Sequence, residues 1–150
     1  MTKQGWCWTA ILLAACGGHS APVQPARSAT AAVQSFMQAV ADSNLTKMAS
    51  LWGTTSGPAS RTGQPPDYQR RIAIIQAFLR NDSYRVTSDA PQGASRRALT
   101  VELRRRTCTW NVPFVAVSLP DESWLVNSVD LATAGNPARA CVEGDSLSQK

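Results

Sequence analysis

The hydrophobic period of this 150-residue chain changes once, near Asn81, and that change limits the fold more than any other feature. Before Asn81, apolar residues recur at intervals of three and four, as on one face of an α-helix. After Asn81 they alternate with polar residues, which is typical of half-buried antiparallel strands. The sequence therefore predicts an α+β fold in which N-terminal helices pack on a curved antiparallel sheet of about four strands.

Two helices are predicted in the first third of the chain. The first begins near Ser28 or Thr30, both suitable N-caps, and ends before the turn-forming residues 42–44. A short second helix continues the apolar stripe and ends at Gly53. The apolar positions at helical spacing are Val33, Phe36, Met37, Val40, Leu45, Met48, Leu51 and Trp52.

A long surface loop and a third helix are predicted next. Residues 53–66 contain three glycines and three prolines among hydroxyl side chains, a composition typical of a loop. Asp67 is predicted to cap the third helix, which stops at Asn81. Its buried stripe consists of Tyr68, Ile72, Ile75 and Leu79, and Ile74 and Phe78 widen it.

Four strands are predicted after Asn81. They are expected around Tyr84 and Val86, over residues 99–103, over 108–119 and over 124–131. Turns at 91–93 and 120–123 separate them, and an irregular tail begins at Gly135. Pro113 cannot donate to a sheet ladder, so it predicts a bulge or an edge within the third strand.

The N-terminal residues have the features of an export signal. Lys3 supplies a cation, and a short apolar run extends from Trp6 to Ala15. This run is too short to span a bilayer, which takes about 20 apolar residues. The sequence predicts a signal at 1–15, a flexible tether at 16–27 and a single domain with a C-terminal tail at 28–150.

The end of this signal, Leu13-Ala14-Ala15-Cys16, resembles the cleavage region of bacterial lipoproteins. The resemblance implies that Cys16 carries a diacylglyceryl group and becomes the first residue after cleavage. Two or more acyl chains give stable anchoring. Gly17 is not the aspartate associated with inner-membrane retention, which favours the outer membrane, facing the periplasm. An ordinary secretory signal, with Cys16 lost or left free, is the alternative.

The other cysteines are interpreted from that compartment. Cys7 would leave with the signal, so Cys108 and Cys141 remain, and in an oxidising envelope they are predicted to form a disulfide. The alternative is two unpaired small apolar residues. The chain's one histidine, His19, lies in the expected tether, so no metal site and no cofactor are predicted.

Five arginines lie close together, at positions 96, 97, 104, 105 and 106, and the formal net charge of the chain is +5. A cluster of this kind would suggest nucleic acid in a cytoplasmic protein. In the envelope no nucleic-acid partner is expected, and anionic lipid or glycan is the more reasonable one. The favoured interpretation is a solvated strand face that keeps a sheet edge soluble.

The order of elements, with the segments 48–53 (MASLWG) and 124–131 (WLVNSVDL), resembles the nuclear transport factor two-like superfamily of SnoaL- and cystatin-like cones. The resemblance implies a curved sheet that wraps the long helix, with a cavity at its open end. Members of that superfamily act as enzymes, ligand binders or dimers, so the fold does not select a function.

We expect a non-catalytic protein that binds a small hydrophobic ligand or an envelope protein. Its expected cavity lining is Phe36, Val40, Phe78, Trp110 and Trp124, although the same residues could simply fill the core. A homodimer through the sheet face is another possibility. The alternative function is an enzyme of the steroid isomerase or polyketide cyclase type with a buried carboxylate. Candidate groups are Asp82, Glu102, Asp130, Tyr68 and Tyr84, but none lies in a recognisable motif, so no catalytic residue is assigned.

Overall fold

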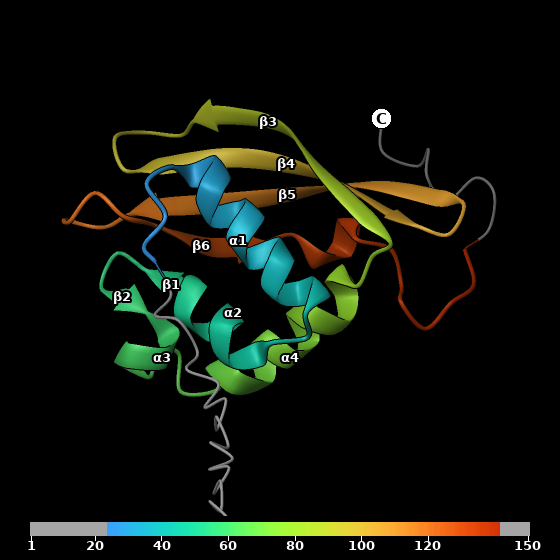
Figure 1. Cartoon of the computed structure of the whole chain (residues 1–150), viewed down its shortest axis with the longest axis horizontal. Helices are drawn as coiled ribbons and strands as arrows, with labels where there is room; N and C mark the ends of the chain where they lie inside the picture. The colour runs from blue at the N-terminus through green and yellow to red at the C-terminus, as the bar shows by residue number, and fades with distance from the viewer. Residues whose placement is uncertain (1–23, 142–150) are drawn as a thin grey trace, which may run out of the picture.

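Residues 24–141 are described in a computed structural model of the protein. Four helices lie on one face of a four-stranded antiparallel sheet, whose strands run in the order β3-β4-β5-β6 (Figure 1). This arrangement confirms the predicted α+β fold with helices N-terminal to the sheet. The expected signal, Cys16 and residues 16–23 of the expected tether lie outside the described residues.

The helices are α1 (Ala29–Ala41), α2 (Leu45–Leu51), α3 (Ala59–Thr62), α4 (Tyr68–Leu79) and the 3-10 helix η1 (Leu131–Thr133). The long strands are β3 (Ser83–Pro91), β4 (Arg96–Arg105), β5 (Cys108–Ser118) and β6 (Trp124–Val129), and a short ribbon is made by β1 (Gly53–Thr54) and β2 (Gly57–Pro58). No helix in residues 24–141 has the length and apolar character needed to cross a membrane.

The ends of the helices follow from local hydrogen bonds. Of the two expected caps of α1, Ser28 is the one used, because its hydroxyl accepts from the backbone N–H of Ala31 at 3.1 Å. Asn44 caps α2 by accepting from Lys47 N–H at 2.9 Å. Asp67 precedes α4 but makes no side-chain cap bond; its carboxylate binds the Arg71 guanidinium at 2.9 Å instead.

The predicted loop over residues 53–66 is partly ordered, because it contains β1, β2 and α3. The ribbon closes very tightly at Gly53, where a Cβ atom would lie 2.3 Å from the Gly57 carbonyl oxygen. The chain then returns to α2, since Ala59 N–H donates to the Trp52 carbonyl at 2.8 Å. Two-residue strands carry no detectable period, so the sequence predicted only a loop.

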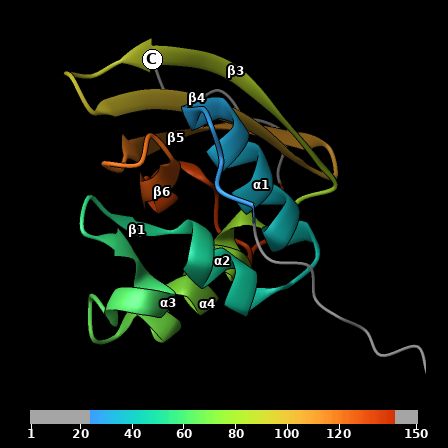
Figure 2. The same ribbon diagram turned by 60° about the vertical axis from the view of Figure 1, so that its left-hand side comes forward.

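The core lies between α1 and the sheet (Figure 2). Alternation along β4 turns Leu99, Val101 and Leu103 toward the helices, and all three are buried. The buried stripe of α1 covers them with Val33, Phe36, Met37, Ala39 and Val40. The element that the sequence predicted as the first helix is therefore the one that fills the concave side of the sheet.

The free edge of β6 is covered by two segments from earlier in the chain. Ala26 and Trp52 form isolated bridges with Trp124 and Val126, and Trp124 N–H donates to the Ala26 carbonyl at 2.9 Å. Ala26 is buried. Ala26, one of the last residues of the expected tether, therefore pairs with the sheet before the cap of α1.

The last strand is shorter than predicted and ends at Val129. Asp130 ends it, because its side chain caps η1 by accepting from Ala132 N–H at 3.1 Å. Asp130 N–H donates to the Pro113 carbonyl at 2.9 Å. Pro113 therefore lies where the β5–β6 ladder stops, and the irregularity in that ladder is two residues further on, between Val115 and Ala116.

Candidate functional site

The five residues expected to line a cavity lie at different places in the described fold. Phe36 and Val40 are buried in the core, and Phe78, Trp110 and Trp124 are half-buried and packed against it. Val40 borders a pocket at the end of α1 and Trp110 borders another beside the disulfide. All five side chains thus contribute to the core, as in the other interpretation that the sequence left open, and Val40 and Trp110 also border pockets.

A different hollow lies between α4 and β6, and we call it the α4–β6 groove. Its volume is about 310 Å³. Its walls are mostly apolar and come from three separate parts of the chain. The lining residues are Trp52, Arg71, Ile74, Ile75, Asn127, Ser128, Val129 and Leu131.

Ile74 gives this groove its exposed apolar surface. Its neighbour Ile75 faces the core, whereas Ile74 is 43% exposed, one of two large hydrophobic residues so exposed in the described chain. The other is Leu45, which is 42% exposed and lies at the start of α2, away from the groove. An exposed isoleucine beside a concave surface is typical of a binding site for apolar groups.

Trp52 contributes a polar group with no partner. Trp52 is the C-cap residue of α2 and is only 8% exposed. Its Nε1 has no hydrogen-bond acceptor. A buried donor that lacks an acceptor costs about 1–3 kcal/mol, and buried indole N–H groups usually have a partner. This N–H is the one buried side-chain nitrogen or oxygen left unpaired among residues 24–141.

The groove also contains one cation. Arg71 uses its Nε to bind the Asp67 carboxylate at 2.9 Å. Hydrogen bonding from Arg71 lowers the pKa of Asp67. A guanidinium has five N–H donors, so Arg71 retains donors for a second oxygen at the groove.

The candidate catalytic groups are dispersed and already engaged. Glu102 receives two bonds of 3.1 Å from Arg85, Asp82 accepts from Arg106 N–H at 2.6 Å, and Asp130 caps η1. The Tyr84 hydroxyl donates to the Gln34 carbonyl at 3.2 Å, and burial raises the pKa of Tyr84. Tyr68 packs against the core. The part of the chain that the structure describes contains no group of three metal-binding side chains.

The arginine cluster is not one solvated face. Arg97 and Arg105 alternate with Leu99, Val101 and Leu103 and so share the helix-facing side of β4. Arg97 binds Asp89, and Arg105 donates to the Phe78 and Arg80 carbonyls at 2.6 and 2.8 Å. Arg96, Arg104 and Arg106 are exposed. The alternation is visible in the sequence. It could have distinguished the two helix-facing arginines from the three exposed ones.

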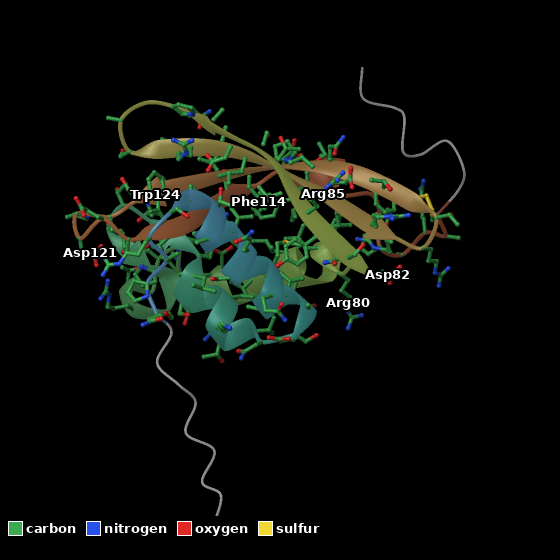
Figure 3. All side chains as sticks on the ribbon, turned by 45° about the horizontal axis from the view of Figure 1, so that its top comes forward. Arg80, Asp82, Arg85, Phe114, Asp121 and Trp124 are labelled. Carbon is green, nitrogen blue, oxygen red and sulfur yellow. A yellow bond between two sulfur atoms is a disulfide. The ribbon has the colours of Figure 1, made fainter. Side chains whose placement is uncertain are left out.

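The structure also contains the disulfide Cys108–Cys141, with the two Cα atoms 5.9 Å apart. It joins the first residue of β5 to the irregular segment that follows η1 (Figure 3). This segment lies at the Arg80 and Asp82 end of the molecule, opposite Asp121 and Trp124.

Comparison of the chain with protein-family models, with curated proteins and with solved structures found no match. The resemblances to lipoproteins and to the cone-shaped superfamily therefore remain hypotheses. Function has to be argued from the groove, the charges and the disulfide.

Proposed function

We propose that this protein is a lipid-anchored, non-catalytic protein of the bacterial envelope. In this proposal it binds, in the α4–β6 groove, a small apolar molecule that carries one oxygen acceptor. The observation that carries the proposal is the unpartnered Nε1 of Trp52, a buried residue that lines an apolar groove.

The apolar part of the ligand is matched by Ile74, Ile75, Val129 and Leu131. Covering such surface is favourable by about 25 cal/mol for each Å² removed from water. The groove volume of about 310 Å³ lies at the small end of ligand pockets, which usually measure about 300–1,000 Å³. A short acyl chain or a single ring system suits it better than a large lipid.

The polar end of the ligand is matched by the Trp52 indole, with Arg71 as the nearby cation. An oxygen that accepts from the indole N–H would recover the free energy of the unmade hydrogen bond. A carboxylate is favoured, because the guanidinium of Arg71 supplies a complementary charge.

The envelope location is supported by the sequence Leu13-Ala14-Ala15-Cys16 and by the disulfide. Disulfides persist in oxidising compartments such as the periplasm and are rare in the cytosol. Mass spectrometry of protein taken from native membranes should find a diacylglyceryl group on Cys16.

The enzyme alternative needs a buried carboxylate facing a cavity. The three candidate carboxylates are instead bound to Arg85, to the Arg106 backbone and to the first turn of η1. These contacts favour binding over catalysis. A protein ligand or a homodimer would cover the same exposed Ile74, so the test must distinguish them from a small molecule.

The test follows the indole ¹H–¹⁵N resonance of Trp52 while the full chain is titrated with decanoate. Its saturable shift is expected. Ile74→Ser should weaken decanoate binding about tenfold, because it removes about 1.4 kcal/mol of apolar contact. Leu45→Ser is the matched control, since Leu45 is equally exposed outside the groove.

Three outcomes would contradict the proposal. They are a Trp52 resonance that does not move, equal weakening by Ile74→Ser and Leu45→Ser, and a dimer that dissociates on Ile74→Ser without any decanoate binding. The last outcome, read by analytical ultracentrifugation, would assign the groove to a second copy of the chain.

A further inference from the structure

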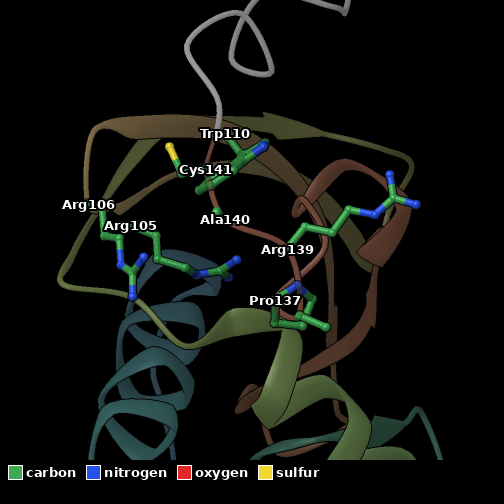
Figure 4. A pocket seen from close by; sticks show the side chains of 8 residues that line it. Arg105, Arg106, Trp110, Pro137, Arg139, Ala140 and Cys141 are labelled. Atoms are coloured by element: carbon green, nitrogen blue, oxygen red, sulfur yellow. The ribbon is translucent and has the colours of Figure 1, made fainter.

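A second hollow lies at the other end of the molecule, beside the disulfide, and we call it the arginine pocket (Figure 4). Its volume is about 240 Å³. Its walls come from the β4–β5 connection and from the segment that precedes Cys141. Three of its lining residues are arginines, Arg105, Arg106 and Arg139, and none is acidic. Figure 4 shows Arg105 and Arg106 on one side and Pro137 and Arg139 on the other.

Arg105 is held in place by neutral groups. Its Nε and Nη2 bind the Arg80 and Phe78 carbonyls at the end of α4, and its guanidinium carbon lies 5.0 Å from the centre of the Trp110 ring. Burial lowers the pKa of Arg105, and the charge of Asp82 opposes that effect. A half-buried guanidinium is thus fixed at the pocket without a carboxylate bound to it.

The other two arginines have no ion pair either. The ion pairs within residues 24–141 involve Arg71, Arg85 and Arg97, which are all outside this pocket. Asp82, whose charge acts on Arg105, accepts from the backbone N–H of Arg106 at 2.6 Å. Both Arg106 and Arg139 are exposed, and their guanidinium groups point away from each other in Figure 4, so both side chains would have to turn toward a phosphate bound between them. Within residues 24–141, the positive charge of these three arginines is therefore not neutralised by any ion pair.

The disulfide holds one wall of the pocket against the other. Cys141 lines the pocket and is bonded to Cys108 at the start of β5. Residues 137–140 have no strand or helix pairing of their own. Gly135 brings this segment close to the sheet, because a Cβ there would lie 2.5 Å from the Trp110 ring. Cleavage of the disulfide would release the wall that carries Arg139.

We propose that the arginine pocket binds the phosphate group of a small soluble phosphate monoester, and that it does so more tightly in the oxidised protein than in the reduced one. Guanidinium groups match phosphate oxygens through paired N–H donors. The volume of about 240 Å³ admits one phosphate with a small substituent, since it lies below the roughly 300 Å³ of the usual ligand pocket. The half-buried Trp110 supplies an apolar wall for that substituent.

The position of the pocket favours a soluble source over a membrane headgroup. The N-terminal segment joins the sheet at Trp124, which pairs with Ser118, whereas the pocket lies at Cys108. These are the two ends of the 11-residue strand β5, about 35 Å apart at about 3.3 Å per residue. This step rests on the lipid anchor proposed above, because that anchor would place the membrane near the Trp124 end.

The test is a titration of the full chain with glycerol 3-phosphate, read from the indole resonance of Trp110, with glycerol as the uncharged control. A saturable shift with glycerol 3-phosphate alone is expected. Arg106→Gln and Arg139→Gln should each weaken binding about tenfold, the usual size of one charge-assisted hydrogen bond. Arg104→Gln removes the same charge from an exposed residue of β4, two positions from Arg106 and outside the pocket, and should change the affinity less than twofold.

Two further arms test the redox and charge requirements. Cys141→Ser should weaken binding as much as the loss of an arginine does, with an unchanged far-ultraviolet circular dichroism spectrum. Glu143 and Asp145 follow Cys141 in the sequence, so the E143Q/D145N variant should bind as tightly as the wild type or more tightly.

Several results would overturn the inference. They are equal weakening by Arg104→Gln, full binding by Cys141→Ser, or weaker binding by E143Q/D145N. Binding to phosphatidylglycerol vesicles through Arg106, without binding of glycerol 3-phosphate, would overturn the soluble source. Because Trp110 reports on this pocket and Trp52 on the α4–β6 groove, failure of one proposal is distinguishable from failure of the other.

Discussion

Asp89 joins three elements at one end of the sheet. Its carboxylate accepts from the Thr30 hydroxyl at the start of α1, at 2.7 Å, and from Arg97 Nε on β4. Burial raises the pKa of Asp89, but the bonds from Arg97 and Thr30 outweigh it, so the pKa is lowered from its usual value. A lowered pKa in the folded state means that the ionised carboxylate stabilises the fold.

Asp89→Asn is expected to lower the free energy of unfolding by about 1–2 kcal/mol at pH 7, because it removes a charge-assisted contact. The wild-type advantage is present above the unfolded pKa of about 4 and is lost as pH falls through the lower folded pKa. Urea unfolding of both proteins between pH 7 and pH 2.5 measures it. A constant difference over this range would contradict this role, and Thr30→Val should reproduce part of the loss.

The hydrogen-bond partners of single residues were only partly predictable from the sequence. The capping role of Ser28 was one of two predicted choices, and Asp67 was predicted to cap α4 but binds Arg71 instead. A carboxylate before a helix can accept from the backbone N–H groups of the first turn or from a nearby arginine. The sequence does not indicate which of these donors lies closer. For Arg97 and Arg105, the alternation with leucines indicates that both lie on the helix-facing side of β4. The cluster of like charges instead suggested a solvated face.

Among the elements, the β1–β2 ribbon depends most on one residue. Gly53 has an ordinary backbone conformation but no room for a side chain, whereas Gly63 has φ of +67° and open space around its Cα. The two glycines are therefore needed for different reasons. The ribbon connects α2 to α3 and lies against β6, since Asn127 donates to the Gly53 carbonyl at 2.8 Å.

Gly53→Ala is expected to cost about 3 kcal/mol, because its Cβ would clash with the backbone of the partner strand. Gly63→Ala should cost only about 1 kcal/mol, the price of a left-handed conformation for a residue with a Cβ. Chemical unfolding measures both. Equal losses would show that the close approach at Gly53 relaxes at little cost.

The elements were predicted well where their period is long. The helices α1, α2 and α4 and the strands β3 to β6 all correspond to predicted segments, because most of them carry several buried residues and β3 alternates the half-buried Tyr84 and Val86 with exposed residues. The short elements β1, β2 and α3 were missed. Their positions are set by close backbone packing at Gly53 and by the Trp52 carbonyl, which are tertiary features.

For the whole molecule, the disulfide is a covalent cross-link between the start of β5 and the segment after η1. It closes a loop with a sequence separation of 33. In the chain-entropy account, a loop of this size stabilises the folded state by about 3–4 kcal/mol. The same link holds the wall of the arginine pocket, so stability and phosphate affinity should decrease together on reduction.

Reduction of the wild type should therefore lower its melting temperature markedly, while a C108S/C141S variant should melt at the same lower temperature with or without reductant. Differential scanning calorimetry measures both, and thiol alkylation followed by mass spectrometry shows that the bond has been cleaved. An unchanged melting temperature in the fully reduced wild type would contradict a stabilising role.

The candidate sites were the least predictable feature. The groove unites Trp52 with residues 71–75 and 127–131, and the arginine pocket unites residues 105–110 with 137–141. Neither juxtaposition has a local sequence signal. Of the aromatic residues expected in a cavity, Phe36 is buried in the core and Phe78, Trp110 and Trp124 pack against it, because apolar residues at regular spacing contribute first to a core.

The bridge between Ala26 and Trp124 determines how the molecule would respond to tension on its N-terminal segment. Such a pull would load one backbone hydrogen bond, from Trp124 N–H to the Ala26 carbonyl, rather than several in parallel. One bond contributes about 1 kcal/mol net, so it would rupture at low force. Its rupture would lengthen the expected tether by a few residues. The sheet and α1 would stay folded, because this junction would separate before the rest of the domain unfolds.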